Sequence, residues 1–189
     1  MKPWPKGGPA NGGTVRVGTL LPMADILLGM GVDPVALLAA EGVDPKVFDD
    51  PDNQIPLTVH NRLIASAVAR SGCPHIGLLV GQRDGLHSLG LAGLLVRYSP
   101  HVETALRSFV RYLHTHVRGG ESALTVDGDV ATLKWEIYQP GVEAGKAAAV
   151  TFLNLLGQVR SRLVSEAKTA EQVAFEVDGE FKSAMGCNC

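Results

Sequence analysis

The spacing of hydrophobic residues changes along the chain, and the change predicts where helices give way to strands. From Val102 to His116 apolar residues recur every three or four positions, which is the period of an amphipathic helix. The segment from Pro56 to about Arg70 has the same period. Shorter apolar segments bounded by Gly or Pro predict helices over 23–30 and 34–41 and a buried helix that ends near Tyr98. The apolar segment "HIGLLVGQ" (75–82) fits either a helix or a strand, and we favour a helix.

Beyond residue 120 the period falls to two. Apolar and polar residues alternate in "VATLKWEIY" (130–138), as in a strand with one buried face. "SALTV" (122–126) precedes it, and the Asp127-Gly128 pair between them is a strong hairpin signal. A long helix is then predicted over about 143–165, and "QVAFEV" (172–177) is a third strand candidate. This order predicts an α+β fold, in which N-terminal helices pack with a small antiparallel sheet.

The tetrapeptide Gly-Val-Asp-Pro occurs twice, starting at residues 31 and 42. Asp33 and Asp44 can each accept a hydrogen bond from the first backbone amides of a helix, and the proline that follows suits the first helical position. Gly42 can adopt the left-handed conformation that ends a helix. We therefore interpret the repeat as two helix starts in series, since two short copies are too few for a repeat array.

Length and charge narrow the possible roles. A chain of 189 residues suits one globular domain, which we place at 15–189 behind a Gly- and Pro-rich lead-in over 1–14 that we expect to be disordered. A net charge of −2 without a basic patch argues against direct binding of nucleic acid. The absence of a long apolar stretch argues against a membrane span, and the sparse cysteines without a signal peptide predict a cytoplasmic protein.

The sequence shows no recognisable catalytic motif, and we predict no catalytic residue, no cofactor and no metal site. The glycine-rich "GLHSLGLAG" (85–93) lacks a phosphate-loop pattern and indicates backbone bends and close helix packing instead. His114 and His116 form an H-x-H pair, but side chains two residues apart diverge at a helix end, so we expect a capping or surface role. The alternative is a small metal-binding protein or enzyme that uses these histidines with Cys187 and Cys189.

A small-molecule pocket is the remaining candidate site. Such pockets are mostly apolar, with a few polar groups that orient the ligand. Arg97, Tyr98, Trp135 and Tyr138 have suitable chemistry, and the predicted elements place them near the junction of helices and sheet. Plain packing in the core and at its rim is the other explanation for each of them.

Four successive segments carry a family resemblance: "GVDPVALLAAEGVDP", "DPDNQIPL", "SGCPHIGLLVGQ" and "LGLAGLLVRYSPHVETALRSFVRYLHTH". In this order they resemble the N-terminal ligand-binding domain of AraC-type transcriptional regulators of the arabinose-binding-like type, over about Val15 to Val177. The resemblance implies a bacterial cytoplasmic domain that senses a small-molecule effector or mediates dimerisation, as a homodimer or as a heterodimer with a full-length regulator. Ligands vary across this family, so arabinose itself is not implied.

The last residues depart from the family pattern. "EFKSAMGCNC" (180–189) matches the start of a segment that in the family leads on to a further strand and to a DNA-binding pair of helix-turn-helix motifs. We therefore expect a sensing domain that is incomplete at its C-terminus and lacks the DNA-binding module. A purely structural or self-association module is a further hypothesis, because an uncovered sheet edge favours association.

Overall fold

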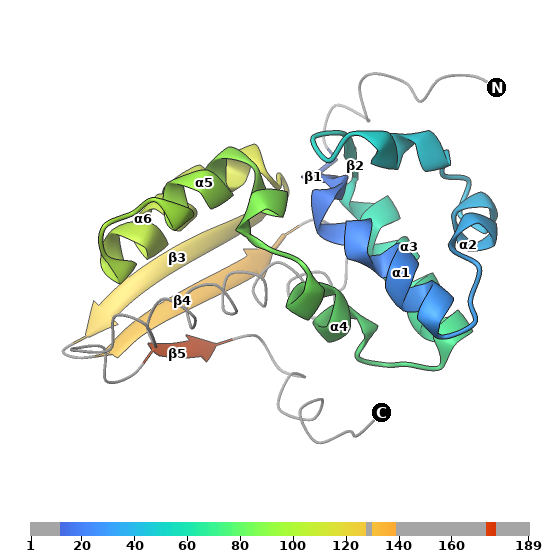
Figure 1. Ribbon diagram of the computed structural model, residues 1–189. Helices are drawn as coiled ribbons and strands as arrows, with labels where there is room; N and C mark the ends of the chain where they lie inside the picture. The colour runs from blue at the N-terminus through green and yellow to red at the C-terminus, as the bar shows by residue number, and fades with distance from the viewer. Residues whose placement is uncertain (1–11, 128–129, 139–172, 177–189) are drawn as a thin grey trace.

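The computed structural model describes residues 12–127, 130–138 and 173–176. Two groups of elements lie side by side, a helical part and a part in which helices cover a sheet (Figure 1). The helical part contains β1 (Thr14–Arg16), η1 (Val17–Leu20), α1 (Leu21–Gly29), α2 (Pro34–Ala40), η2 (Pro45–Asp49), β2 (Gln54–Pro56), α3 (Leu57–Ser71) and α4 (Ile76–Arg83). The sheet part contains η3 (Leu86–Leu89), α5 (Leu91–Arg97), α6 (Val102–Tyr112), η4 (Leu113–Thr115), β3 (Gly120–Asp127), β4 (Val130–Ile137) and β5 (Val173–Glu176).

The predicted α+β class is confirmed, and each helix predicted within the described residues is present with slightly different ends. The helix expected to run to His116 ends earlier, because α6 stops at Tyr112 and tightens into η4. The helix expected over 143–165 lies outside the described residues.

The predicted hairpin is confirmed, but the third strand pairs differently from expectation. β3 and β4 are antiparallel, with Gly120 opposite Ile137 and Asp127 opposite Val130. β5 instead lies parallel to β4, so the expectation of a wholly antiparallel sheet is wrong. Parallel neighbours need a connection of about a dozen residues or more, and the chain between β4 and β5 is long enough for such a crossover.

The sequence did not predict the pairing of β1 with β2, since three-residue strands are too short to show a period. Val15 lies opposite Ile55 in this antiparallel pair, and it also bridges to Val117 beyond η4. The Arg16 amide donates to the His116 carbonyl at 3.1 Å, and the Arg118 amide donates to the Thr14 carbonyl at 2.7 Å. β1 therefore connects the helical part to the chain that leads into the sheet.

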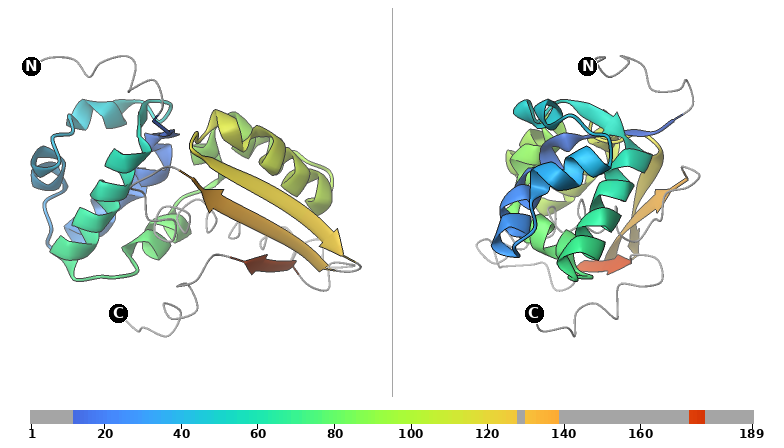
Figure 2. Two further views of the ribbon diagram at one scale, coloured as in Figure 1. Left: turned by 180° about the vertical axis from the view of Figure 1, so that it is seen from behind. Right: turned by 90° about the vertical axis from the view of Figure 1, so that its right-hand side faces the viewer.

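One hydrophobic core runs through both parts. It includes the fully buried side chains of Leu27 and Leu63 in the helical part and of Phe109 and Leu133 in the sheet part. α5 and α6 lie together along the β3–β4 hairpin (Figure 2). Within the described chain no single helix is long and apolar enough to cross a membrane, although two bent pairs of helices reach that length and composition together.

The glycines of the 85–93 segment confirm the predicted bends and close packing. Gly90 has a positive φ of 59° before α5. A Cβ atom at Gly93 would overlap the backbone carbonyl of Leu86, because α5 packs directly on η3.

We predict that Gly93→Ala destabilises the domain by about 1–3 kcal/mol, because the clash is with backbone that cannot rotate away. Urea unfolding followed by circular dichroism would measure the change. Gly29→Ala is the matched control, since Gly29 lies in α1 with nothing within 4 Å of an added Cβ. That control should be neutral or stabilising by up to about 1 kcal/mol. Equal effects of the two substitutions would contradict the packing argument.

Candidate functional site

A pocket of about 190 Å³ lies in the helical part between α1, α2 and η2. Every described residue that lines it has an apolar side chain. The lining residues are Leu20, Leu21, Met23, Ala24, Leu27, Pro34, Val35, Leu37, Leu38, Pro45 and Phe48. The pocket can therefore hold an apolar group, and none of its described lining side chains can pair with a charge.

The doubled tetrapeptide builds one wall of this pocket. Gly31 and Gly42 end α1 and α2 with positive φ values of 74° and 70°. After each glycine the valine amide donates back into the helix, from Val32 to the Leu27 carbonyl and from Val43 to the Leu38 carbonyl, each at 2.9 Å. This is the hydrogen-bond pattern of a Schellman motif.

Each repeat then starts the next helix. The Asp33 carboxylate accepts from the Val35 amide at 2.9 Å, and the Asp44 carboxylate accepts from the Lys46 amide at 3.0 Å. The predicted caps are thus confirmed, and the two prolines that follow them both line the pocket.

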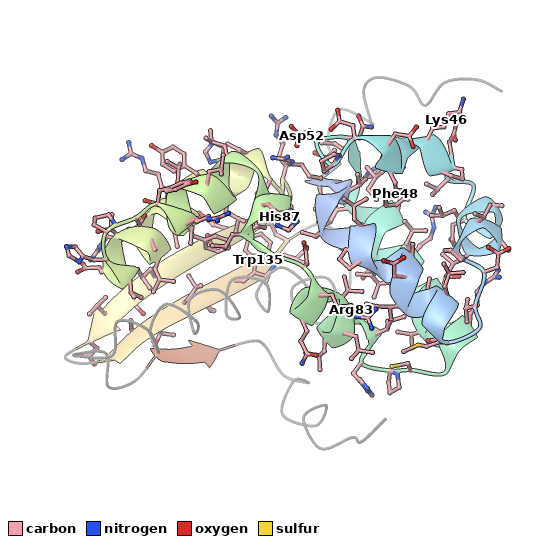
Figure 3. All side chains as sticks on the ribbon, in the orientation of Figure 1. Lys46, Phe48, Asp52, Arg83, His87 and Trp135 are labelled. Atoms are coloured by element: carbon pink, nitrogen blue, oxygen red, sulfur yellow. The ribbon has the colours of Figure 1, made fainter. Side chains whose placement is uncertain are left out.

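The pocket has a buried floor and an open rim. Met23, Leu27 and Leu37 are buried at the floor, whereas Leu21 and Val35 are exposed. Phe48, which Figure 3 labels, lines the pocket from η2 and packs partly against the core. A bound molecule could therefore bury one end and keep another end in solvent.

A second notable feature is a buried polar cluster formed by Arg16, His60 and His116, which we call the histidine cluster. His60 and His116 are 2% and 1% exposed, and Arg16 is 9% exposed. The Nδ1 atom of His60 and both ring nitrogens of His116 have no hydrogen-bond partner among the described residues. The Arg16 guanidinium pairs with the Asp52 carboxylate at the surface.

Burial makes both imidazoles hard to protonate. It lowers the pKa of His60 to about 4. Burial is also the largest cause that lowers the pKa of His116, and the positive charges of Arg16 and His60 lower it further, to about 3. Burial also lowers the pKa of Arg16, while the Asp50 carboxylate raises it. Both histidines are therefore neutral near pH 7.

The expectation of a capping or surface role holds for His114 but is wrong for His116. The exposed His114 ring has its Nδ1 3.0 Å from the Arg111 carbonyl at the end of α6. His116 turns inward because its backbone carbonyl accepts from β1, which draws this residue into the core. Within the described part of the chain no three His, Cys, Asp or Glu side chains gather to hold a metal ion, and Cys187 and Cys189 lie outside it.

The four residues that the sequence suggested for ligand binding lie apart from the apolar pocket. Arg97 and Tyr98 are exposed at the end of α5, with the Arg97 Cζ atom 5.8 Å from the centre of the Tyr98 ring. Trp135 is buried in β4, where its ring lies against Gly120, and Tyr138 is exposed just after β4. A ligand role for these residues stays a prediction.

Comparisons with known proteins agree with the resemblance in the sequence. Residues 31–180 match the family described as the arabinose-binding domain of AraC transcription regulators, at their N-terminus. The chain belongs to this family. It is also similar to the ornithine utilization regulator of Pseudomonas aeruginosa, with 29% identity over 153 residues. That match covers 81% of this chain and 45% of the relative, so the chain spans less than half the length of this curated relative.

Sequence reasoning alone did not find the pocket of this AraC-type domain. The doubled tetrapeptide correctly predicts where helices end and begin, but nothing local shows that Pro34, Pro45 and Phe48 face α1. Three neighbouring apolar segments, each bounded by a glycine, were the available signal. The same three segments could equally pack into a closed core that leaves no pocket.

The histidine cluster should make this AraC-type domain lose stability in acid. The unfolded chain takes up protons on His60 and His116 near pH 6.5, whereas the folded state does so only near pH 4 and pH 3. The unfolded state therefore binds more protons, and the free energy of unfolding falls as the pH drops below 6.5, by about 1.4 kcal/mol per pH unit for each imidazole. Urea unfolding between pH 7.5 and pH 4.5 would measure this slope.

Replacing one buried histidine separates its contribution from general acid effects. His116→Gln and His60→Gln should each reduce the slope by about 1.4 kcal/mol per pH unit, which is the contribution of one proton. This holds whatever the substitutions do to stability at pH 7. His114→Gln is the matched control, because it removes an exposed imidazole that lies two residues from His116 and outside the histidine cluster. If all three variants show the same slope, the loss of stability in acid does not come from His60 and His116.

Proposed function

We propose that this chain is the effector-sensing domain of an AraC-type regulator and binds its small-molecule effector in the pocket between α1, α2 and η2. The domain belongs to a family of ligand-sensing regulatory domains. The observation that carries the proposal is the open apolar pocket in that domain, because small-molecule sites are concave and mostly apolar. The role is one of binding rather than of catalysis.

The pocket walls differ in how firmly they are held, and this supports a sensing role. α1 places Met23, Ile26 and Leu27 in the core. Among the residues of α2 only Leu37 is buried, and η2 has no buried residue. Segments with few buried contacts open at low free energy. A ligand that contacts both walls would therefore favour one arrangement of α2 and η2, and the rest of the regulator would respond to that shift.

A thermal-shift screen of this chain against small metabolites tests the proposal. A ligand that binds only the folded state at about 100 times its Kd stabilises by about 2.7 kcal/mol, which raises the Tm of a domain of this size by roughly 5–10 °C. The screen should include both charged amino acids, among them ornithine because of the relative's name, and apolar compounds. If no small molecule raises the Tm, the proposed function is wrong.

Self-association is a second candidate function, and a surface of α5 favours it. Leu91, Leu94 and Tyr98 are 56%, 46% and 74% exposed, and their spacing of three and four residues places them on one side of the helix. Exposed apolar side chains gathered in a stripe are typical of protein interfaces. We propose that this stripe, Leu91, Leu94 and Tyr98, forms the contact of a homodimer or of a heterodimer with a full-length regulator.

Leu94→Glu should convert a dimer to a monomer, because it places a charge in the centre of the stripe. Sedimentation analysis over a concentration series would measure the change in dissociation constant, which we expect to exceed about tenfold. Leu28→Glu is the matched control, since Leu28 is 60% exposed on α1 in the helical part. A dimer that survives Leu94→Glu, or that is lost equally in the control, would rule out this surface.

A further inference from the structure

We infer that the effector presents an uncharged hydrocarbon group of roughly six to eight carbon atoms to the pocket between α1, α2 and η2. This inference rests on the proposed function and adds the chemical class of the ligand. Three observations support it: the composition of the lining, the volume, and the position of the rim.

The lining excludes a charged or strongly polar group from the interior of the pocket. Each described side chain that lines it is apolar, including Met23 and Leu27 at the floor and Phe48 from η2. A polar group that loses water without gaining a hydrogen bond weakens binding, and an isolated charge weakens it far more. Among the described residues, the buried side chains with an unpartnered polar atom include those of Thr19, His60 and His116, and none of these three lines the pocket.

The volume sets the size of the buried group. A pocket of about 190 Å³ is somewhat larger than an apolar cavity of about 150 Å³ that accepts benzene. The occupant is therefore a short alkyl chain or a single substituted ring. Each methylene that enters should improve affinity by about fourfold, which corresponds to about 0.8 kcal/mol, until the pocket is full.

The rim allows the rest of the effector to be polar. Leu21, Ala24 and Val35 line the pocket and are also exposed, so the opening faces solvent. A polar head would remain hydrated there and would contribute little to affinity. Selectivity would then come from the length and shape of the apolar group.

Linear 1-alkanols of four to ten carbons are suitable probes, because they share one head group and differ only in apolar length. Their dissociation constants for the 189-residue chain would be measured by calorimetry, with thermal shift as a second readout. We expect affinity to rise by about fourfold per methylene and to level off at roughly six to eight carbons.

Two variants connect this binding to the pocket. Ala24→Leu fills the pocket from an exposed helical position and should weaken 1-octanol binding by at least about tenfold, since it replaces the space of about two or three methylenes. Ala39→Leu is the matched control, an exposed helical alanine of α2 outside the lining, and should change affinity by less than about twofold. Phe48→Ala enlarges the pocket and should move the plateau to longer alkanols, an effect that simple destabilisation would not produce.

The outcomes separate this inference from the proposed function. If alkanols do not bind, or bind Ala24→Leu and Ala39→Leu equally well, the hydrocarbon inference is wrong. If a charged amino acid from the metabolite screen nevertheless raises the Tm, the sensing function stands and only the ligand class is overturned. If neither kind of compound raises the Tm, both the inference and the proposed function fail.

Discussion

The short strand β1 is the contact on which the arrangement of this domain depends. Residues Thr14–Arg16 pair on one edge with β2 and on the other with the chain around His116–Arg118. Each of these partners comes from a different part of the sequence, so three residues of extended backbone hold the helical part against the sheet part. A buried backbone group without a partner is costly, which makes this double pairing hard to rearrange.

The same contact explains why polar side chains are buried at the junction. Once Arg16 and His116 are joined through their backbones, both side chains lie in or beside the core, together with His60 from α3. Arg16 keeps a route to the surface through its pair with Asp52, whereas the two imidazoles are neutral instead. The histidine cluster is therefore a consequence of the way the two parts meet, and its sensitivity to acid is a property of that junction.

The pocket lies away from this junction, where the structure is held more lightly. α2 and η2 are short helices whose ends are fixed by local caps and whose burial is slight. The caps satisfy the first backbone amides of each helix, and segments with so few buried side chains open at low free energy. A ligand-sensing family would gain from this separation, because the proposed site lies apart from the contact that holds the domain together.

Sequence alone determined the features whose interactions span a few residues. The caps at Asp33 and Asp44, the glycine stops at Gly31 and Gly42, and the hairpin pairing of Asp127 with Val130 all depend on neighbours in the chain, so the α+β class and its family could be predicted. Tertiary structure decided the pairing of β1, the parallel placement of β5, the burial of His116 and the apolar groups that share a pocket. These features depend on partners far apart in the sequence, and a residue's local pattern does not record which distant segment will pack against it.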